Sequence, residues 1–269
     1  MNLGVSYNFF NGEEHLIQSI KCIRNEVDHL NIVYQEISNK GMPLSNDARD
    51  VLSFLKKEKL VDEFYCYEPD LQLKPQINEL NKRRIGLEIA KKHSMSHFMT
   101  MDADEFYRSN EFKFAKEFID NNNVLNSTVR SYMHIKSPNW RALDSTLVPF
   151  IFKITDKVTV KRRYFVKNVD PTRKFIAKAS LIQSLFYKKH HIFPIDQIAM
   201  FHMNLVRKDM LISKFKNSST NNLVFFEKLQ NEFLNWDIKK GFFCFPGKGI
   251  IQPFYVENEF GVWSPDEGK

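Results

Sequence analysis

The sequence predicts an α/β fold, with a mixed sheet flanked by helices in a single domain. Its 269 residues are 43% hydrophobic and 26% charged, which allows one large buried core and excludes a disordered or fibrous chain. Strand and helix signals alternate along the first third of the chain, a pattern typical of βαβ units with parallel strands. Beyond residue 123 strand signals predominate, and no linker rich in Pro, Gly or Ser separates the two parts.

The first βαβ unit is expected at the start of the chain. Residues 3–7 form a short apolar run that ends in a polar turn at 8–12. Apolar residues then recur at i, i+4, i+7 and i+11, which places them on one face of a helix. These residues are Leu16, Ile20, Ile23 and Val27. Acidic residues, Glu13 and Glu14, fall in the first turn, where the helix dipole favours negative charge.

Three more strands and two more helices continue the alternation. Strands are predicted at 30–34, 61–67 and 97–101, and helices near 47–57 and 76–93. Parallel α/β sheets bind ligands at the carboxyl ends of their strands. We therefore expect the turns after Tyr7, Tyr34 and Met101 to lie on one edge of the sheet.

The rest of the chain is richer in strands. We predict strands at 124–135, 147–154, 158–165 and 198–205, a helix at 224–236, and irregular structure over the last thirty residues. The chain then has three parts within the same domain. Residues 1–110 form the first half, 111–220 form a second half with mixed strands, and 221–269 form a C-terminal helix and tail.

Charge and cysteine content limit the class of protein. Lys and Arg exceed Asp and Glu by 39 − 32 = 7, which favours an anionic partner such as a nucleotide diphosphate, a nucleic acid or an acidic membrane. The three cysteines are far apart, so neither a disulfide framework nor a cysteine-based zinc site is expected. We see no signal peptide and no apolar run of about 18 residues. A cytoplasmic protein that at most contacts a membrane peripherally is the expectation.

The strongest local signal is an acidic pair at the end of the strand 97–101. Asp102 and Asp104 flank Ala103, and side chains two residues apart in extended chain point the same way. Both carboxylates can therefore reach one divalent cation, which could neutralise the phosphates of a nucleotide. A solvated acidic turn is the alternative explanation for this pair.

Four segments, in this order, resemble the glycosyltransferases of the GT-A fold, and especially glycosyltransferase family 2. Residues 5–8 with 12–14 are similar to the family's first strand and helix start, and 32–39 to its second strand and base-binding loop. Residues 82–90 resemble its Ala-Arg-Asn-x-Gly helix, with Arg83 at the Arg. Residues 98–105 resemble the metal-binding DxD segment. The family usually has Asp near Gln35, so this sequence departs from the pattern there.

The resemblance extends over residues 1–110 and implies a Rossmann-like nucleotide-sugar-binding half that ends in the DxD. It implies an enzyme that moves a sugar from a UDP- or GDP-sugar to a hydroxyl of a glycan or glycoconjugate, usually with inversion. Mn²⁺ or Mg²⁺ is the implied cofactor. The implied donor-binding residues are Tyr7, Asn8, Glu13, Gln35, Arg83, Asp102, Arg207 and Lys208.

A later segment, 201–208, is similar to GT-A enzymes that use a late His as a metal ligand and a basic residue a few positions on for the diphosphate. The metal ligands implied in this chain are Asp102, Asp104 and His202. An imidazole is more compatible with Mn²⁺ than with Mg²⁺.

The acceptor side has weaker signals. Trp140 and Arg141 could form a platform for a sugar ring, although a packed loop Trp fits the sequence equally well. Asp196 and Asp170 are the candidates for the base that takes the acceptor proton. Neither lies in a recognisable Glu-Asp motif, so a retaining reaction stays open. The turn 169–174 carries Arg173, which could reach a carboxylate or phosphate, and the basic run 161–163 could face an anionic acceptor or water.

Other classes of function are less well supported. A nucleotidyltransferase would need a Gly-rich basic loop after the first strand, whereas residues 8–12 contain one Gly and no Lys or Arg. A non-enzymatic, basic nucleic-acid-binding protein fits the net charge, but no recognition motif is present and no nucleic acid is expected. A catalytically inactive GT-A domain is the third alternative.

Overall fold

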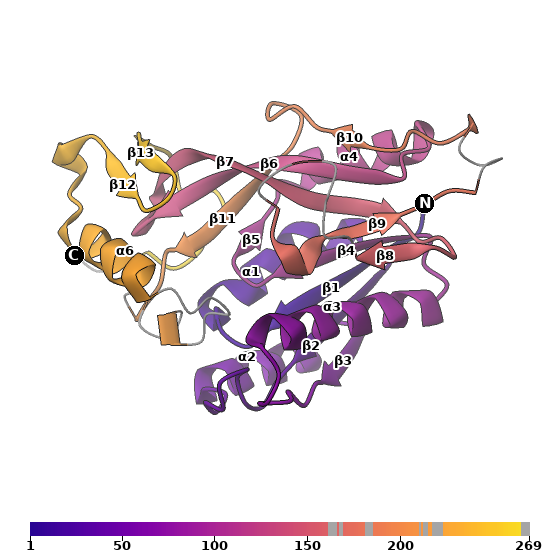
Figure 1. Ribbon diagram of the computed structural model, residues 1–269, viewed down its shortest axis with the longest axis horizontal. Helices are drawn as coiled ribbons and strands as arrows, with labels where there is room; N and C mark the ends of the chain where they lie inside the picture. Colours follow the sequence, from indigo (N-terminus) through magenta and orange to yellow (C-terminus); the bar gives the residue numbers. More distant parts are fainter. Residues whose placement is uncertain are drawn as a thin grey trace.

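The computed structural model describes residues 1–160, 166, 169–180, 185–209, 211, 215–216 and 223–264. Within these residues a ten-stranded sheet has the order β3-β2-β1-β4-β7-β6-β11-β5, with β10 beside β6 and β14 beside β7 (Figure 1). Its strands are β1 Leu3–Phe9, β2 His29–Tyr34, β3 Glu63–Cys66, β4 His97–Asp102, β5 Glu105–Phe106, β6 Asn126–Ile135, β7 Ser137–Lys153, β10 His191–Ile192, β11 Ala199–Leu205 and β14 Phe254–Tyr255.

The sheet is mixed in direction. Strands β3, β2, β1 and β4 are parallel to one another, as the βαβ pattern predicts. Strand β7 is antiparallel to both β4 and β6, while β11 is parallel to β6. Two small hairpin-like pairs lie outside it: β8 Val158–Val160 with β9 Phe175–Ala177, and β12 Phe243–Phe245 with β13 Gly249–Ile251. The predicted fold class, α/β with a mixed sheet flanked by helices, is confirmed.

Helices flank the sheet; those before residue 122 pack on the two faces of the parallel strands, and the last packs on β6, β11 and β12. They are α1 Glu13–Ile23, α2 Asn46–Lys57, α3 Pro75–Lys92, α4 Ser109–Asn121 and α6 Leu223–Asn235, with 3-10 turns η1 Arg24–Glu26, η2 Pro171–Arg173 and η4 Ile238–Lys240. Met99 and Met101 of β4 belong to the core shared with α1, α2 and α4. Phe98, on the other face of β4, packs instead with Leu87 and Ala90 of α3. Burial on both faces explains the apolar runs within β1, β2 and β4.

Helix α3 lies unusually close to β1. A Cβ atom added at Gly86 would lie 2.1 Å from Ser6 Oγ, so only glycine permits this approach. A Cβ atom at Gly4 would similarly meet Ala90 Cβ at 2.9 Å. This close packing places the side chains of Lys82 and Arg83, one turn earlier on α3, near the carboxyl ends of β1 and β4.

Some expected elements differ from the structure. Helix α1 ends at Ile23 and a 3-10 turn follows, so Val27 is buried but not helical. Strand β7 starts at Ser137 rather than near 147, because it pairs along most of β6. Trp140 is therefore a strand residue and not a loop residue.

The tail also contains more regular structure than expected. Strand β14 pairs with β7, and β12 pairs with β13. Helix α4 is an addition to the predicted elements, although Phe112, Ala115 and Ile119 have helical spacing and are buried. Residues 161–165 of the predicted strand 158–165, and with them the basic run 161–163, lie outside the described residues. No helix in the described part of the chain has the length and apolarity needed to span a membrane.

Candidate functional site

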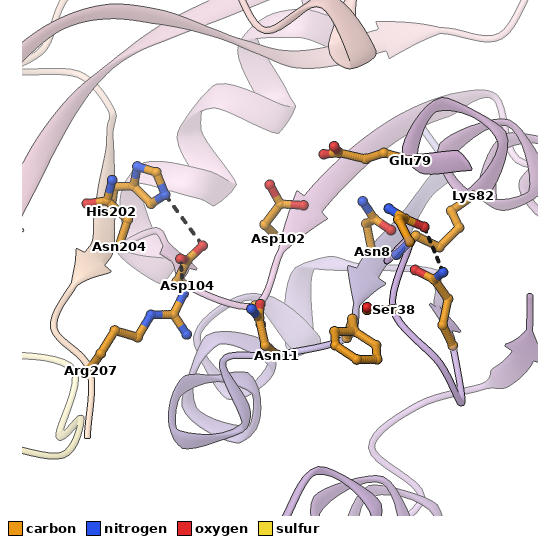
Figure 2. Close-up of a pocket in the computed structure, with 14 residues that line it drawn as sticks. Asn8, Asn11, Ser38, Glu79, Lys82, Asp102, Asp104, His202, Asn204 and Arg207 are labelled. Atoms are coloured by element: carbon orange, nitrogen blue, oxygen red, sulfur yellow. Dashed lines mark hydrogen bonds and ion pairs between the residues drawn. The ribbon is translucent and has the colours of Figure 1, made fainter. Parts of the chain in front are cut away.

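The carboxyl ends of the parallel strands form the edge where the site lies. Asn8 pairs in register with Asp102, and Phe9 with Tyr34, so the turns after β1, β2 and β4 do meet as expected. A pocket of about 330 Å³ opens there (Figure 2). Six of the sequence-predicted residues line it: Asn8, Gln35, Asp102, Asp104, His202 and Arg207.

Amide side chains line the side of the pocket formed by β1 and β2. Gln35 is 1% exposed, and its Nε2 donates to Asn39 Oδ1 at 2.8 Å. Asn8 Oδ1 is buried and has no hydrogen-bond partner among the described residues. An unsatisfied acceptor in a polar pocket is costly unless a ligand or water donates to it. This part of the pocket therefore suits a ligand that carries N–H or O–H groups.

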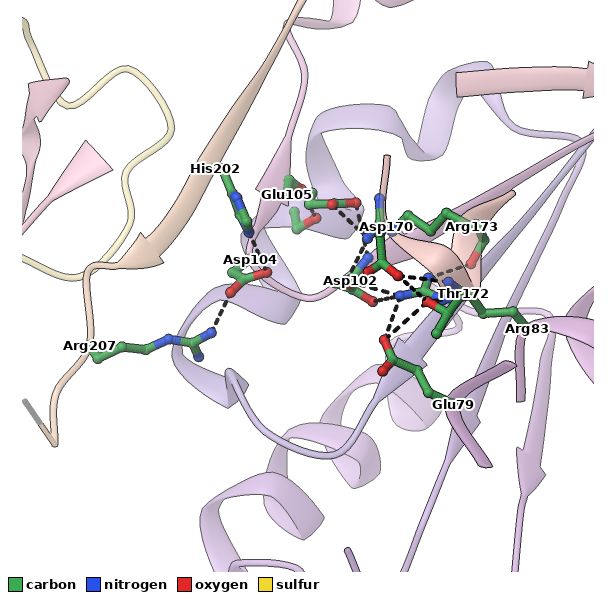
Figure 3. A network of polar contacts seen from close by, with 12 residues as sticks. Glu79, Arg83, Asp102, Asp104, Glu105, Asp170, Thr172, Arg173, His202 and Arg207 are labelled. Atoms are coloured by element: carbon green, nitrogen blue, oxygen red, sulfur yellow. Dashed lines mark hydrogen bonds and ion pairs between the residues drawn. The ribbon is translucent and has the colours of Figure 1, made fainter. Parts of the chain in front are cut away.

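Asp102 is held by two buried arginines (Figure 3). Arg83 Nη2 donates to its two carboxylate oxygens at 2.9 and 3.2 Å. Arg173 Nη2 pairs with Asp102 Oδ2 and, at 2.6 Å, with Glu105 Oε1. Burial opposes ionisation of Asp102, but the charges of Arg173 and Arg83 outweigh it and lower the pKa of Asp102. Asp102 is therefore a carboxylate whose oxygens already face cations of the protein.

Arg83 is fully engaged behind the pocket. Besides Asp102, its guanidinium donates to Glu79 Oε1 at 3.0 Å, Thr100 Oγ1 at 2.8 Å and Thr172 Oγ1 at 3.2 Å. Arg83 is 1% exposed and does not line the pocket. Its effect on a ligand would therefore pass through Asp102 rather than through direct contact.

Asp104 has a different environment on the other side of the pocket. Its Oδ2 pairs with Arg207 Nη2, and its Oδ1 lies 3.4 Å from His202 Nε2 (Figures 2 and 3). Arg207 Nη1 also lies 3.7 Å from Glu14 Oε1. Burial raises the pKa of Glu14, although Arg207 opposes this shift. Strand β11 thus supplies an imidazole, and the segment after it a cation, to the acidic turn that follows β4.

Lys82 also lines the pocket, but the sequence does not assign it a role. It is 4% exposed, and burial lowers its pKa to about 8. The charged form is therefore still the major one at pH 7. A buried ammonium at a polar pocket is a site for an anionic group. The signal in the sequence is its position beside Arg83, but only helix geometry shows which side chain reaches the pocket.

A second pocket of about 170 Å³ adjoins the first and shares Asp102, His202 and Asn204 with it. Strand β7 and the η2 turn line its far side. Asp170 lies there, and its Oδ1 accepts hydrogen bonds from Thr172 N at 2.7 Å and from Thr172 Oγ1 at 2.8 Å. A group bound in this pocket would lie beside a ligand in the first.

Several predicted residues are not brought into either pocket. Tyr7 is fully buried, and its hydroxyl bonds to Ser19 Oγ at 2.9 Å. Glu13 accepts a hydrogen bond from Ser45. Lys208 and Asp196 are exposed, and Asp196 lies in a turn before β11. None of these four residues lines either pocket.

The predicted acceptor platform is part of a packed aromatic cluster. Trp140 is half-buried against Trp236 and Tyr255, with ring centroids 6.4 and 5.3 Å away. The Arg141 guanidinium stacks 4.6 Å from the Tyr132 ring centroid and pairs with Glu259 at 3.2 Å. Neither residue lines the two pockets. These contacts give both side chains a packing role at the start of β7.

Arg173 and Glu105 belong to the network, and the sequence alone does not reveal their pairing. The sequence predicts that Arg173 reaches a carboxylate or phosphate of a substrate, whereas it contacts the chain's own Asp102 and Glu105. Burial raises the pKa of Glu105, against the lowering effect of Arg173. Both partners lie far from Arg173 in the chain, and no local pattern in a single sequence reports such a contact.

No protein-family model matches this sequence, and no curated protein sequence matches it significantly. Solved structures with local similarity include S. aureus TarS, at 13% identity and a TM-score of 0.34 over 51% of this chain and 22% of that one. A glycosyltransferase involved in glycosylation of the major capsid of PBCV-1 has 13% identity and a TM-score of 0.26, over 49% of this chain and 52% of that one. Mannose-1-phosphate geranyltransferase from Thermus thermophilus has 10% identity and a TM-score of 0.30, over 58% and 51%. The matched region thus spans at most about half of each of these chains.

Proposed function

We propose that this protein is a glycosyltransferase that moves a sugar from a nucleotide-sugar donor to an acceptor hydroxyl. The observation that carries the proposal is the pocket at the carboxyl ends of β1, β2 and β4, where Asp104, His202, Arg207 and Lys82 converge. Ligands of open α/β sheets bind at this edge. The ordered resemblance to GT-A glycosyltransferases over residues 1–110 supports the same reaction class, and the adjoining second pocket offers a place for the acceptor.

The donor would lie across the first pocket. Gln35 and Asn8 would hydrogen-bond the nucleoside, since both present amide groups to the pocket. Arg207 and Lys82 would supply fixed positive charge to the diphosphate. Charge develops on the diphosphate as the sugar leaves, so preorganised cations stabilise the transition state more than the bound donor. Gln35 accepts and donates hydrogen bonds, which suits either a uracil or a guanine edge.

The residues at Asp104 fit a divalent cation, while Asp102 does not fit as a direct ligand. Two ligand atoms about 2.1 Å from one ion lie about 3.0–3.4 Å apart at angles of about 90–110°. Asp104 Oδ1 and His202 Nε2, 3.4 Å apart, match this spacing. The Asp102 oxygens face Arg83 and Arg173 instead. Asp104 and His202 would therefore hold Mn²⁺, or Mg²⁺, which when bound supplies further charge neutralisation for the leaving diphosphate.

Asp170 is the base that we favour over Asp196. Asp170 lines the second pocket, whereas Asp196 lies in an exposed turn outside both pockets. Hydrogen bonds from Thr172 fix the orientation of the Asp170 carboxylate. In this role Asp170 would accept the proton of an acceptor hydroxyl bound in the second pocket as its oxygen bonds to the sugar, while the bond to the diphosphate breaks and the nucleoside diphosphate leaves in the first pocket. This arrangement of acceptor and donor on opposite sides of the sugar would give inversion. A cytoplasmic protein that acts on a glycan or glycoconjugate completes the proposal.

The proposal can be tested by measuring ligand binding and donor cleavage with the full chain. UDP, GDP and their sugar conjugates should raise the melting temperature, more so with Mn²⁺, because ligands that bind only the native state stabilise it. The best donor should release its nucleoside diphosphate when incubated with the enzyme. His202→Ala should weaken the Mn²⁺ effect, while Asp196→Asn serves as the matched control at an exposed carboxylate.

Three outcomes would contradict the proposal. The first is a folded protein that binds no nucleoside diphosphate or nucleotide sugar. The second is release of pyrophosphate from a nucleoside triphosphate, which would indicate a nucleotidyltransferase. The third is salt-dependent binding of DNA or RNA without any effect of nucleotide sugars, which would indicate a nucleic-acid-binding protein.

A further inference from the structure

A second cluster of potential metal ligands lies at the opposite edge of the sheet. His29 is the first residue of β2, Glu63 is the first residue of β3, and His93 caps the C-terminal end of α3. Each offers one ligand atom, and the three atoms lie within 4.8 Å of one another. Among the described residues this is the one place where three His, Cys, Asp or Glu side chains gather so closely.

This cluster is separate from the nucleotide pocket. Strand β2 runs from His29 to Tyr34, and Gln35, the next residue, lines the pocket. Five steps along an extended strand cover about 17 Å. The two sites therefore lie at opposite ends of the same strand, next to different ends of α3 (Figure 1). The inference does not depend on the proposed function.

Burial and unsatisfied polarity at His29 point to a ligand. His29 is 7% exposed, and its Nε2 atom is buried without a hydrogen-bond partner among the described residues. A buried ring nitrogen without a partner is costly, and each such group calls for an explanation. The His29 and His93 rings stack with centroids 3.9 Å apart and an interplanar angle of 19°. Because a metal binds in the plane of each imidazole, the more exposed His93 ring must turn for both rings to reach one ion.

The other two side chains are already oriented together. His93 Nε2 lies 2.8 Å from Glu63 Oε2, and Lys92 Nζ lies 3.6 Å from Glu63 Oε1. The side chains of His93 and Glu63 are 37% and 26% exposed, which leaves a path for an ion from solvent. A cation that replaces the shared proton between His93 and Glu63 would be bound by both, with the imidazole N–H then on Nδ1.

We propose that His29, Glu63 and His93 bind one Zn²⁺ ion that links β2, β3 and α3. Two imidazoles and one carboxylate are a known type of zinc donor set, with water in the fourth position of the tetrahedron. This mixture of nitrogen and oxygen ligands suits Zn²⁺ better than Mg²⁺ or Ca²⁺, which prefer oxygen. The ion joins three segments that are distant from one another in the chain, and so stabilises the amino-terminal edge of the sheet.

The test measures Zn²⁺ binding to the full chain by competition with a chromogenic chelator, and the visible spectrum of the Co²⁺ form. We expect Zn²⁺ binding at this cluster that is retained in His202→Ala, which separates it from the nucleotide pocket. His93→Ala is the main variant because this side chain is exposed, and it should weaken Zn²⁺ binding by at least about a hundredfold. The intense bands of tetrahedral Co²⁺ should disappear in the same variant.

His190→Ala is the control, since it removes a half-buried histidine that lies just before β10. Zn²⁺ should also raise the melting temperature of the wild type and of His190→Ala, but not of His93→Ala. Glu63→Gln keeps the shape of the side chain and should likewise lose most of the affinity. Absence of Zn²⁺ binding in the wild type, or equal affinity in His93→Ala and Glu63→Gln, would overturn the proposal.

Discussion

The carboxylates of Asp102, the last residue of β4, and of Asp104, in the turn that follows, lie in contrasting surroundings. Asp102 contacts two buried arginines that come from α3 and η2. Asp104, two residues later, contacts Arg207 and lies beside His202. Both carboxylates line the same pocket. The charge of Asp102 is neutralised by Arg83 and Arg173, whereas Asp104 contacts His202 of β11 and Arg207 in the segment after it. The same motif therefore provides one residue that braces the site and one that can bind a ligand.

The difference follows from what each partner can do. Two guanidiniums, Arg83 and Arg173, form a closed network with Asp102 and Glu105, in which every charge has an opposite neighbour. Removing one partner of such a network leaves a buried charge without compensation. The Asp104 side contains an imidazole, which can bind a cation through a nitrogen lone pair when neutral. We therefore expect substitutions on the Asp102 side to affect mainly stability, and those on the Asp104 side to affect activity as well as stability, since Asp104 and Arg207 are also buried.

The largest effect is expected for Asp104→Asn. This change removes the negative charge that holds Arg207 and, in our proposal, the cation. Loss of one preorganised electrostatic group typically costs about 10²–10³ in rate, so we expect a fall of about a thousandfold in donor turnover. The measurement is release of nucleoside diphosphate at saturating Mn²⁺. Asp196→Asn is the matched control and should keep full activity. Wild-type turnover in Asp104→Asn would show that Asp104 binds neither the donor nor its cation.

Asp102→Asn should act mainly on stability. The amide cannot neutralise Arg83 and Arg173, which would remain buried with one fewer anion. Since the Asp102 side chain is 32% exposed, we discount the cost of a fully buried pair and expect a loss of about 2 kcal/mol. Urea unfolding measures this loss. An unchanged unfolding midpoint would mean that the network contributes nothing to the fold.

The pKa of Asp102 gives this prediction a pH dependence. The folded protein holds that pKa below its usual value, so the stabilisation is present above the unfolded-state pKa of about 3.9. It is lost as the pH falls through the lower, folded-state value. The stability difference between wild type and Asp102→Asn should therefore shrink below about pH 4.

A smaller effect on stability is expected when the close packing of α3, which carries Arg83, against β1 is disturbed. Gly86→Ala would place a Cβ atom 2.1 Å from Ser6 Oγ and 2.5 Å from Ser6 Cβ, so α3 must move away from β1. Overpacking of this kind costs about 1–3 kcal/mol, and thermal unfolding should show it. Glu88→Ala, at an exposed position of the same helix, is the control and should change stability by less than about 0.5 kcal/mol. Full stability of Gly86→Ala would show that the close approach is not required.

The parallel half of the fold can be predicted from the sequence because its signals are local. Helices α1, α2 and α3 and strands β1 to β4 lie within a few residues of their predicted positions. Strands β1, β2 and β4 are buried on both faces, which gives short apolar runs that the sequence reveals. The length of β7 escapes prediction because it depends on pairing with β6, and β14 because it depends on pairing with β7. Such pairings are set by tertiary contacts rather than by local pattern.

For the site, the sequence predicts residues that line the pocket but not the ion-pair partners behind it. Asp102, Asp104, His202 and Arg207 do meet, since strand ends and one later segment identify them. The partners of Asp102 cannot be inferred, because Arg173 lies much further along the chain, beyond β7 and β8. The cluster of His29, Glu63 and His93 cannot be predicted either, because its members lie far apart in the chain and show no short metal-binding spacing. Trp140 stands out by residue type, yet its neighbours Trp236 and Tyr255 make it part of a packed cluster.

Lys82 provides the most sensitive test of whether the Asp102 side also binds the ligand. It lines the pocket on that side but is not part of the ion-pair network around Asp102. If it binds the diphosphate, Lys82→Met should weaken nucleoside diphosphate binding by about tenfold at pH 7, a modest value for one charged hydrogen bond. Burial lowers the pKa of Lys82 to about 8, so the free enzyme loses this charge as the pH rises through 8. Wild-type affinity should therefore fall between pH 7 and 9, whereas the affinity of Lys82→Met should stay nearly constant. Isothermal titration at both pH values measures this difference.

Arg84→Met, on the exposed side of α3, is the control and should keep the wild-type pH dependence. The same fall in affinity for Lys82→Met would instead assign the titration to another group and leave Asp104 and Arg207 as the donor-binding side.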